Sequence, residues 1–262
     1  MIFAGLLLLA IGAADLTRRA PVPLARRVGL AALAVAILVL GALTNAPLPA
    51  LVAVALAAEW VWLMPAGRAA KAGVWPAIAV LAACAIGVAS IPPRADPGVI
   101  RDVWLLPSPA GEVSFDLVVL VAGALVFFAE SANIVVRAAL RGEFALPPVP
   151  SARAERGVGV TADAGAASAA DPVPLTAQPS LKGGRLIGPL ERVIVFSLTL
   201  AGAYTLLAAV LAAKGIVRFP EISRDDNGDR AEYFLVGSLV SWALALALAV
   251  LVWWGGASPH LG

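Results

Sequence analysis

Long apolar runs separated by short polar stretches make up most of the chain. A helix that crosses a bilayer needs about 20 mainly apolar residues, with a range of about 17–25. Seven runs approach or reach this length, and we expect each of them to form a helix. The predicted helices cover residues 2–15, 28–44, 49–66, 72–90, 114–136, 193–213 and 234–254.

One long polar stretch interrupts this pattern between the fifth and sixth predicted helices. Residues 142–184 are rich in Pro, Ala, Gly and Ser and show neither helical nor strand periodicity. Such a segment buries too little apolar surface to fold, so we expect a disordered cytoplasmic linker. The linker divides the chain into a five-helix membrane block (1–141) and a two-helix membrane hairpin with a polar outer loop (185–262).

The composition narrows the class of protein. Hydrophobic residues make up 61% of the 262 positions, and charged residues make up 14%. A soluble domain has about 45–50% apolar and about 25% charged residues, and a core of this size could not cover the excess. These values exclude a soluble enzyme, a nucleic-acid-binding domain and a disulfide-stapled secreted module. The predicted fold class is an all-α, polytopic transmembrane helix bundle of about seven spans.

Residues that bind metals or act as nucleophiles are scarce. The single cysteine, Cys84, lies inside an apolar run, where a thiol behaves as a small hydrophobe. The single histidine, His260, lies in the C-terminal tail, which leaves none for a metal centre or for Ser-His or Cys-His catalysis in the membrane. We predict neither a metal nor a cofactor, and the sequence leaves open whether the protein is an enzyme.

The distribution of Lys and Arg predicts an orientation, because cytoplasmic loops carry an excess of these residues. Thirteen of the 19 fall in one set of loops and six in the other. This places the N-terminus outside and the C-terminus in the cytoplasm. The larger set consists of Arg18, Arg19, Arg26, Arg27, Arg68, Lys71, Arg137, Arg141, Arg153, Arg156, Lys182, Arg185 and Arg192.

Ionisable side chains within apolar spans are costly, so they indicate candidate functional residues. Glu59 lies about ten residues into the third predicted helix, near the membrane midplane, with no partner in its own helix. One interpretation is a proton or cation site. The other is a carboxyl group that burial keeps neutral and that bonds to a neighbouring helix.

Three polar residues near the end of the fifth predicted helix share one face. Glu130, Asn133 and Arg137 are spaced by three and by seven positions, which predicts a polar seam directed into the bundle. Arg137 lies about 10 Å along the axis from Glu130, so contact requires both side chains to lean, or Asn133 to bridge them. The seam could serve transport, or it could be a packing network with Arg137 reaching the interface.

The stretch before the sixth predicted helix resembles a capped helix start. Pro189 suits a first helical turn, and Glu191 in that turn would complement the helix dipole. Arg185 and Arg192 could contact anionic lipid on the cytoplasmic side. A phosphate-binding Gly-rich loop is the weaker interpretation, because the Walker A pattern is absent.

Further cations and a stripe of small residues flank the last two predicted helices. Lys214 and Arg218, four positions apart, could bind a lipid phosphate at the outer interface or simply extend to it. Small residues recur every fourth position in the last helix, which allows close packing against the sixth helix or a homo-oligomer contact. This stripe consists of Gly237, Ser241, Ala245 and Ala249.

The C-terminal part carries the pattern G-x-L-E-R, then A-K, then R-F-x-E, then E-Y-x-L-x-G with a serine beyond it. The residues concerned are Gly184, Arg185, Ile187, Gly188, Leu190, Glu191, Arg192, Ala213, Lys214, Arg218, Phe219, Glu221, Glu232, Tyr233, Phe234, Gly237 and Ser241. The segment resembles a group of uncharacterised bacterial integral membrane proteins without an established activity. The resemblance implies a bacterial inner-membrane protein in which Glu191, Arg192, Lys214, Arg218, Glu221 and Glu232 act as a set, with Glu191, Glu221 and Glu232 in a structural network.

Three functional hypotheses follow. A small transporter or channel would use the intramembrane groups Glu59, Glu130, Asn133 and Arg137. A membrane-embedded enzyme or binder of an anionic lipid or isoprenoid phosphate would use Lys214, Arg218, Arg185 and Arg192. An accessory subunit would pack against a larger membrane complex. We favour transport, with membrane lipids as partners, a homo-oligomer as a further possibility and no role for nucleic acid.

Overall fold

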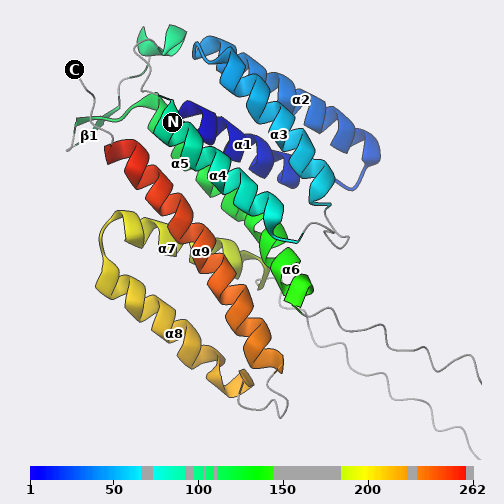
Figure 1. Cartoon of the computed structure of the whole chain (residues 1–262), viewed down its shortest axis with the longest axis vertical. Helices are drawn as coiled ribbons and strands as arrows, with labels where there is room; N and C mark the ends of the chain where they lie inside the picture. Colours follow the sequence, from blue (N-terminus) through cyan, green and yellow to red (C-terminus); the bar gives the residue numbers. More distant parts are fainter. Residues whose placement is uncertain are drawn as a thin grey trace, which may run out of the picture.

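The computed structural model describes residues 1–65, 73–91, 97–102, 104, 106–108, 111–143, 184–222 and 229–257. These residues form nine α-helices, one short 3₁₀ helix and one two-stranded hairpin, which confirms an all-α fold for the described part (Figure 1). The elements are α1 (Ile2–Thr17), α2 (Pro23–Leu43), α3 (Pro47–Leu63), α4 (Trp75–Ser90), η1 (Gly98–Asp102), β1 (Pro107–Ser108), β2 (Gly111–Glu112), α5 (Phe115–Ala129), α6 (Ser131–Glu143), α7 (Gly184–Leu200), α8 (Tyr204–Ile222) and α9 (Asp229–Ala257). The predicted linker over 142–184 lies almost wholly outside them.

The first helix, the shortest in the sequence pattern, is the centre of the bundle. α1 packs against α2, α3, α4 and α5 and is buried along most of its length. Glycines bring α1 and α5 into backbone contact: a Cβ on Gly5 would lie 2.7 Å from the Leu120 nitrogen, and one on Gly12 would lie 2.7 Å from the Phe127 nitrogen. This close approach places the end of α1 beside the end of α5.

α2 and α3 form an antiparallel pair on one side of α1 (Figure 1). Their turn uses Asn45 at φ 52°, a left-handed conformation that asparagine tolerates, and the amide of Ala46 donates to the carbonyl of Gly41. Gly41 permits close packing there, since a Cβ would lie 2.2 Å from the Cβ of Ala50. Most of the outer face of α2 is exposed, as in a helix that faces lipid.

The fifth predicted helix, 114–136, is interrupted. α5 ends at Ala129, α6 begins at Ser131, and the two axes differ by 49°. The expectation of one straight helix is therefore wrong. Apolar periodicity does not reveal the interruption, because it depends on side chains from other helices that contact Glu130 and its neighbours.

The sixth predicted helix, 193–213, is also interrupted. α7 ends at Leu200, Gly202 adopts φ 67°, and the amide of Ala203 donates to the carbonyl of Leu198. This left-handed glycine with a six-residue hydrogen-bonded ring is a common helix stop. α7 also begins earlier than expected, at Gly184, so Pro189 lies inside the helix and Glu191 does not lie in its first turn.

α9 packs against α7 and α6. The predicted contact between the last helix and the helix over 193–213 is therefore made mainly by the α7 part of that segment. A Cβ on Gly237 would lie 3.6 Å from Leu140 of α6, and Ala245 and Ala249 are fully buried within the chain. The small-residue stripe thus serves contacts inside one molecule. A homo-oligomer through it would have to displace these helices, and it stays an untested prediction.

Both ends of the described chain lie at the same end of the bundle. A Cβ on Gly255 would lie 3.0 Å from the Met1 sulfur, and Figure 1 shows the red end of α9 close to the start of α1. The predicted placement of the termini on opposite sides of a membrane therefore disagrees with the structure. The reason is that α7 and α8 fold back on each other instead of making one crossing.

Length and composition identify two candidate membrane spans among the described residues, Pro23–Leu43 and Ala231–Ala257. The bent pair α5 and α6 becomes a third if it is counted as one broken span. Four further apolar helices are shorter: Ile2–Thr17, Pro47–Leu63, Trp75–Ser90 and Tyr204–Val217. The chain is accordingly a candidate membrane protein.

Candidate functional site at the break between α5 and α6

A group of polar side chains surrounds the break between α5 and α6. They come from α1 and the residues just after it, and from α3, α6, α7 and α9. We call this group the break cluster: Asp15, Arg18, Arg19, Trp60, Glu130, Ser131, Asn133, Arg137, Arg192 and Ser241.

Asp15 is the most deeply buried carboxylate of the break cluster. It lies near the end of α1 and is 1% exposed. Its Oδ2 accepts hydrogen bonds from the indole of Trp60 at 3.0 Å and from the hydroxyl of Ser131 at 2.5 Å, and its Oδ1 pairs with Arg18. A buried carboxylate without such partners would be strongly disfavoured by desolvation.

Arg18 and Arg19 connect the end of α1 to two other helices. Arg18 donates to the backbone carbonyls of Val61 and Met64, both at 3.0 Å. Its charge therefore lies at the C-terminal end of α3, where the helix dipole favours a cation. Arg19 forms an ion pair with Glu130 at the break.

Glu130 occupies the position between α5 and α6 and is 6% exposed. Besides Arg19 it contacts Arg137, with 3.4 Å between Oε1 and Nη2. The predicted polar face thus brings Glu130 and Arg137 together through leaning side chains. Asn133 does not bridge them, because its amide donates to the carbonyl of Ala129 and its Oδ1 accepts from another helix.

That other donor is Arg192 of α7, which sequence reasoning assigned to anionic lipid. It is 2% exposed. Its guanidinium donates to the Oδ1 of Asn133 at 2.8 Å, to the carbonyl of Phe128 at 3.2 Å and to the hydroxyl of Ser241 at 3.0 Å. Arg192 therefore joins α5, α6, α7 and α9, and its role as a lipid contact on the molecular surface is wrong.

The charges of the break cluster match the two helix ends that the break creates. The last carbonyls of α5 carry partial negative charge, and the first amides of α6 carry partial positive charge. Arg192 lies at the first end through the carbonyl of Phe128, and Asp15 lies at the second through Ser131. Side chains of the protein itself thus take the places where a bound anion or cation would be stabilised.

A second ion pair lies beside the break cluster. The ammonium group of Lys214 contacts both carboxylate oxygens of Glu191, at 2.6 and 2.7 Å, and the indole of Trp242 donates to Glu191 at 2.6 Å. Lys214 also lies 5.2 Å from the Trp242 ring and 5.5 Å from the Phe234 ring. The predicted topology had placed Glu191 and Lys214 on opposite sides of the membrane, which this contact contradicts.

Glu59 lies apart from these groups. It is exposed, one turn before the end of α3, and it borders a cavity of about 130 Å³ between α3 and α4 with Trp60 and Pro76. Within the described ranges it makes no hydrogen bond or ion pair. Its predicted position near the middle of a helix is wrong, because α3 already ends at Leu63.

The remaining predicted residues are only partly placed. The side chains of Arg185, Arg218 and Glu221 lie outside the described part of the structure, and Glu232 is exposed near the start of α9. In the portion that the structure describes, no three His, Cys, Asp or Glu side chains are close enough to share a metal ion.

The sequence analysis did not identify Asp15, Arg18, Arg19, Trp60 or Ser131 as site residues. A signal for Asp15 was present, because it is the only acidic residue of the first predicted helix and Arg18 follows it at helical spacing. No known protein family, curated protein or solved structure matches this chain.

Proposed function

We propose that the protein is a small multipass membrane transporter or channel that moves protons through the break cluster. The observation that carries this proposal is the burial of two carboxylates, Asp15 at 1% and Glu130 at 6% exposure, at an interrupted apolar helix. Ionisable residues inside membrane bundles typically form proton or ion pathways.

The interrupted helix supports a transport function more directly than the apolar pattern of the sequence does. Transporters commonly place their sites where discontinuous helices expose unpaired backbone groups near the middle of the membrane. The break between α5 and α6 is such a discontinuity, because the two helices bend by 49° within one candidate span. Its contacts with Asp15 and Arg19 place it beside the end of α1. Arg192 donates to the carbonyl of Phe128 in the last turn of α5, and Asp15 accepts from the hydroxyl of Ser131 at the start of α6. Because protein side chains fill the break, we infer that the transported species is a proton, which needs the least additional space.

Glu130 offers a way to couple protonation to movement. Its carboxylate holds Arg19 of α1 and Arg137 of α6. A proton on Glu130 would remove the charge that attracts both arginines and would free the end of α1 from the break. Such a change in a buried ion pair can bias a bent helix between two arrangements.

The orientation is part of the proposal. We infer that α1 to α4, the bent pair α5–α6, and α9 cross the inner membrane of a bacterium, while α7 and α8 form a folded-back pair. The loop between α4 and α5 carries only Arg94 and Arg101 as basic residues. The positive-inside rule then places the turn between α1 and α2 in the cytoplasm and both termini outside.

Proton uptake into proteoliposomes that contain a pH-sensitive dye tests the proposal. Wild-type protein should acidify the lumen under an inward proton gradient, with a charge-compensating ion present, and Glu130→Gln should reduce the rate at least tenfold. Glu112→Gln, at an exposed site in β2, is the matched control and should keep the wild-type rate. Equal rates for wild type and empty vesicles would overturn the proposal.

A further inference from the structure

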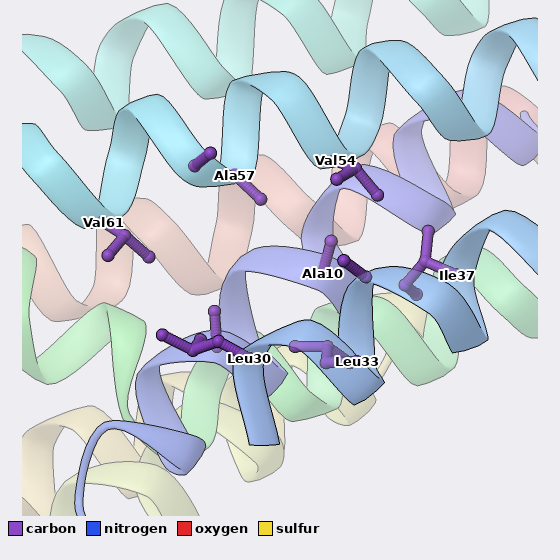
Figure 2. A pocket seen from close by; sticks show the side chains of 10 residues that line it. Ala10, Leu30, Leu33, Ile37, Val54, Ala57 and Val61 are labelled. Carbon is purple, nitrogen blue, oxygen red and sulfur yellow. The ribbon is translucent and has the colours of Figure 1, made fainter. Parts of the chain in front are cut away.

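An apolar groove lies outside the break cluster, between α1, α2 and α3, and is called here the α1–α3 groove. Its volume is about 190 Å³. Figure 2 shows Leu30, Leu33 and Ile37 of α2 facing Ala10 of α1, with Val54 and Val61 of α3 on the other wall. An apolar cavity of about 150 Å³ already takes up a benzene molecule, so the groove has room for a hydrocarbon segment.

Two arginines lie on α2 beyond the end of the groove wall that this helix contributes. Arg26, Leu30, Leu33 and Ile37 follow one another at spacings of four, three and four residues, so they lie along one stripe of α2. Arg27 lies beside Arg26 in the first turns of the helix, and both side chains are exposed. Neither arginine side chain makes an ion pair or hydrogen bond with any residue that the structure describes.

The length of this stripe matches one leaflet of a membrane. Arg26 and Ile37 are separated by eleven helical residues, or about 16 Å at about 1.5 Å per residue. The hydrocarbon core of a bilayer is about 30 Å thick, so one leaflet contributes about 15 Å. A lipid with its phosphate at Arg26 and Arg27 would therefore have one chain beside the groove over the full depth of its leaflet.

We propose that the α1–α3 groove binds one acyl chain of an anionic phospholipid whose headgroup phosphate pairs with Arg26 and Arg27. The free arginines select the charge, because basic residues next to a membrane favour anionic lipids. The wholly apolar walls accept the chain, and the partial burial of Leu30 and Leu33 leaves them open to lipid. This site lies away from the break cluster and from the lipid contacts predicted at Lys214 and Arg218.

Native mass spectrometry of the full chain in mild detergent tests the proposal, with phosphatidylglycerol and phosphatidylcholine as the added lipids. Wild-type protein should bind one phosphatidylglycerol more tightly than phosphatidylcholine. Arg26→Gln and Arg27→Gln should each reduce this preference about fivefold. Arg141→Gln, at an exposed arginine of α6, should leave it unchanged.

A second pair of variants tests the groove itself. Ala34→Leu fills the groove wall, whereas Ala36→Leu makes the same change on an exposed face of the same helix. Ala34→Leu should abolish binding of the single lipid, and Ala36→Leu should retain it. Equal binding by these two variants, an unchanged preference after both arginine substitutions, or a co-purifying isoprenoid phosphate in place of phospholipid would overturn the proposal. The arginine variants remain decisive if Ala34→Leu does not fold.

Discussion

The two interrupted helices, α5–α6 and α7–α8, are held by different forces. At the first, Arg192 of α7 donates to the carbonyl of Phe128 in α5, and Asp15 of α1 accepts from the hydroxyl of Ser131 in α6. At the second, Gly202 stops the helix through its own backbone conformation, and both Gly202 and its neighbour Ala201 are exposed. A helix break that is maintained by buried charges is a candidate functional site. A helix break that is maintained by a local turn only connects two helices.

The largest effect should follow removal of the cation at the first break. Arg192→Met leaves the carbonyl of Phe128 and the amide oxygen of Asn133 buried without their charged donor. We expect the free energy of unfolding in detergent to fall by about 3 kcal/mol. Arg141→Met, at an exposed arginine of α6, should change it by less than about 0.5 kcal/mol. Equal stability of these two variants would show that the break does not depend on Arg192.

Removal of the anion should cost somewhat less. Asp15→Asn keeps the shape and can still accept bonds from Trp60 and Ser131, but it loses the charge that faces Arg18. We expect a loss of about 2 kcal/mol in the same unfolding measurement. Glu112→Gln is the control, and an Asp15→Asn variant as stable as this control would contradict a charged Asp15.

The second break should respond to backbone conformation alone. Gly202→Ala places a side chain at φ 67° and should destabilise the protein by about 1 kcal/mol. Gly215→Ala, in open space within α8, should raise stability by a similar amount because alanine is the better helix former. Two changes of the same sign would be inconsistent with a turn fixed by Gly202.

The smallest effect concerns the contact that holds α8. Lys214→Met and Glu191→Gln each break one ion pair whose side chains are 24% and 13% exposed. We expect a coupling energy of about 0.5–1 kcal/mol in a double-mutant cycle and faster amide hydrogen exchange confined to α8. Additive effects of the two substitutions would contradict a direct interaction.

The two breaks also show what the sequence could predict. Every α-helix in the described part of the chain overlaps one of the predicted apolar runs, because burial and lipid exposure both require long apolar stretches. The runs did not include the end of α6 or the first half of α7. The shared face of Glu130 and Arg137 followed from helical spacing alone. Gly202 lies within a predicted helical run, but a single glycine does not by itself predict that a helix ends there in a left-handed conformation.

The contacts that α1 makes at the break could not be predicted from the sequence. Arg19 and Asp15 lie more than 100 positions away, and they reach the break because Gly5 and Gly12 let α1 approach α5 closely. In the sequence, Arg192 cannot be distinguished from an exposed basic residue near the start of a helix. Only the packing of α7 against α9 shows that it is buried.

A direct comparison of Glu130→Gln with Glu59→Gln tests the central claim most directly. The sequence identifies both carboxylates as candidate transport sites, whereas the structure buries Glu130 among arginines and leaves Glu59 exposed on α3. Both variants would be reconstituted at equal density, and proton flux would be measured under one imposed gradient. We predict loss of flux for Glu130→Gln and wild-type flux for Glu59→Gln. Loss of flux in Glu59→Gln with normal flux in Glu130→Gln would contradict the account.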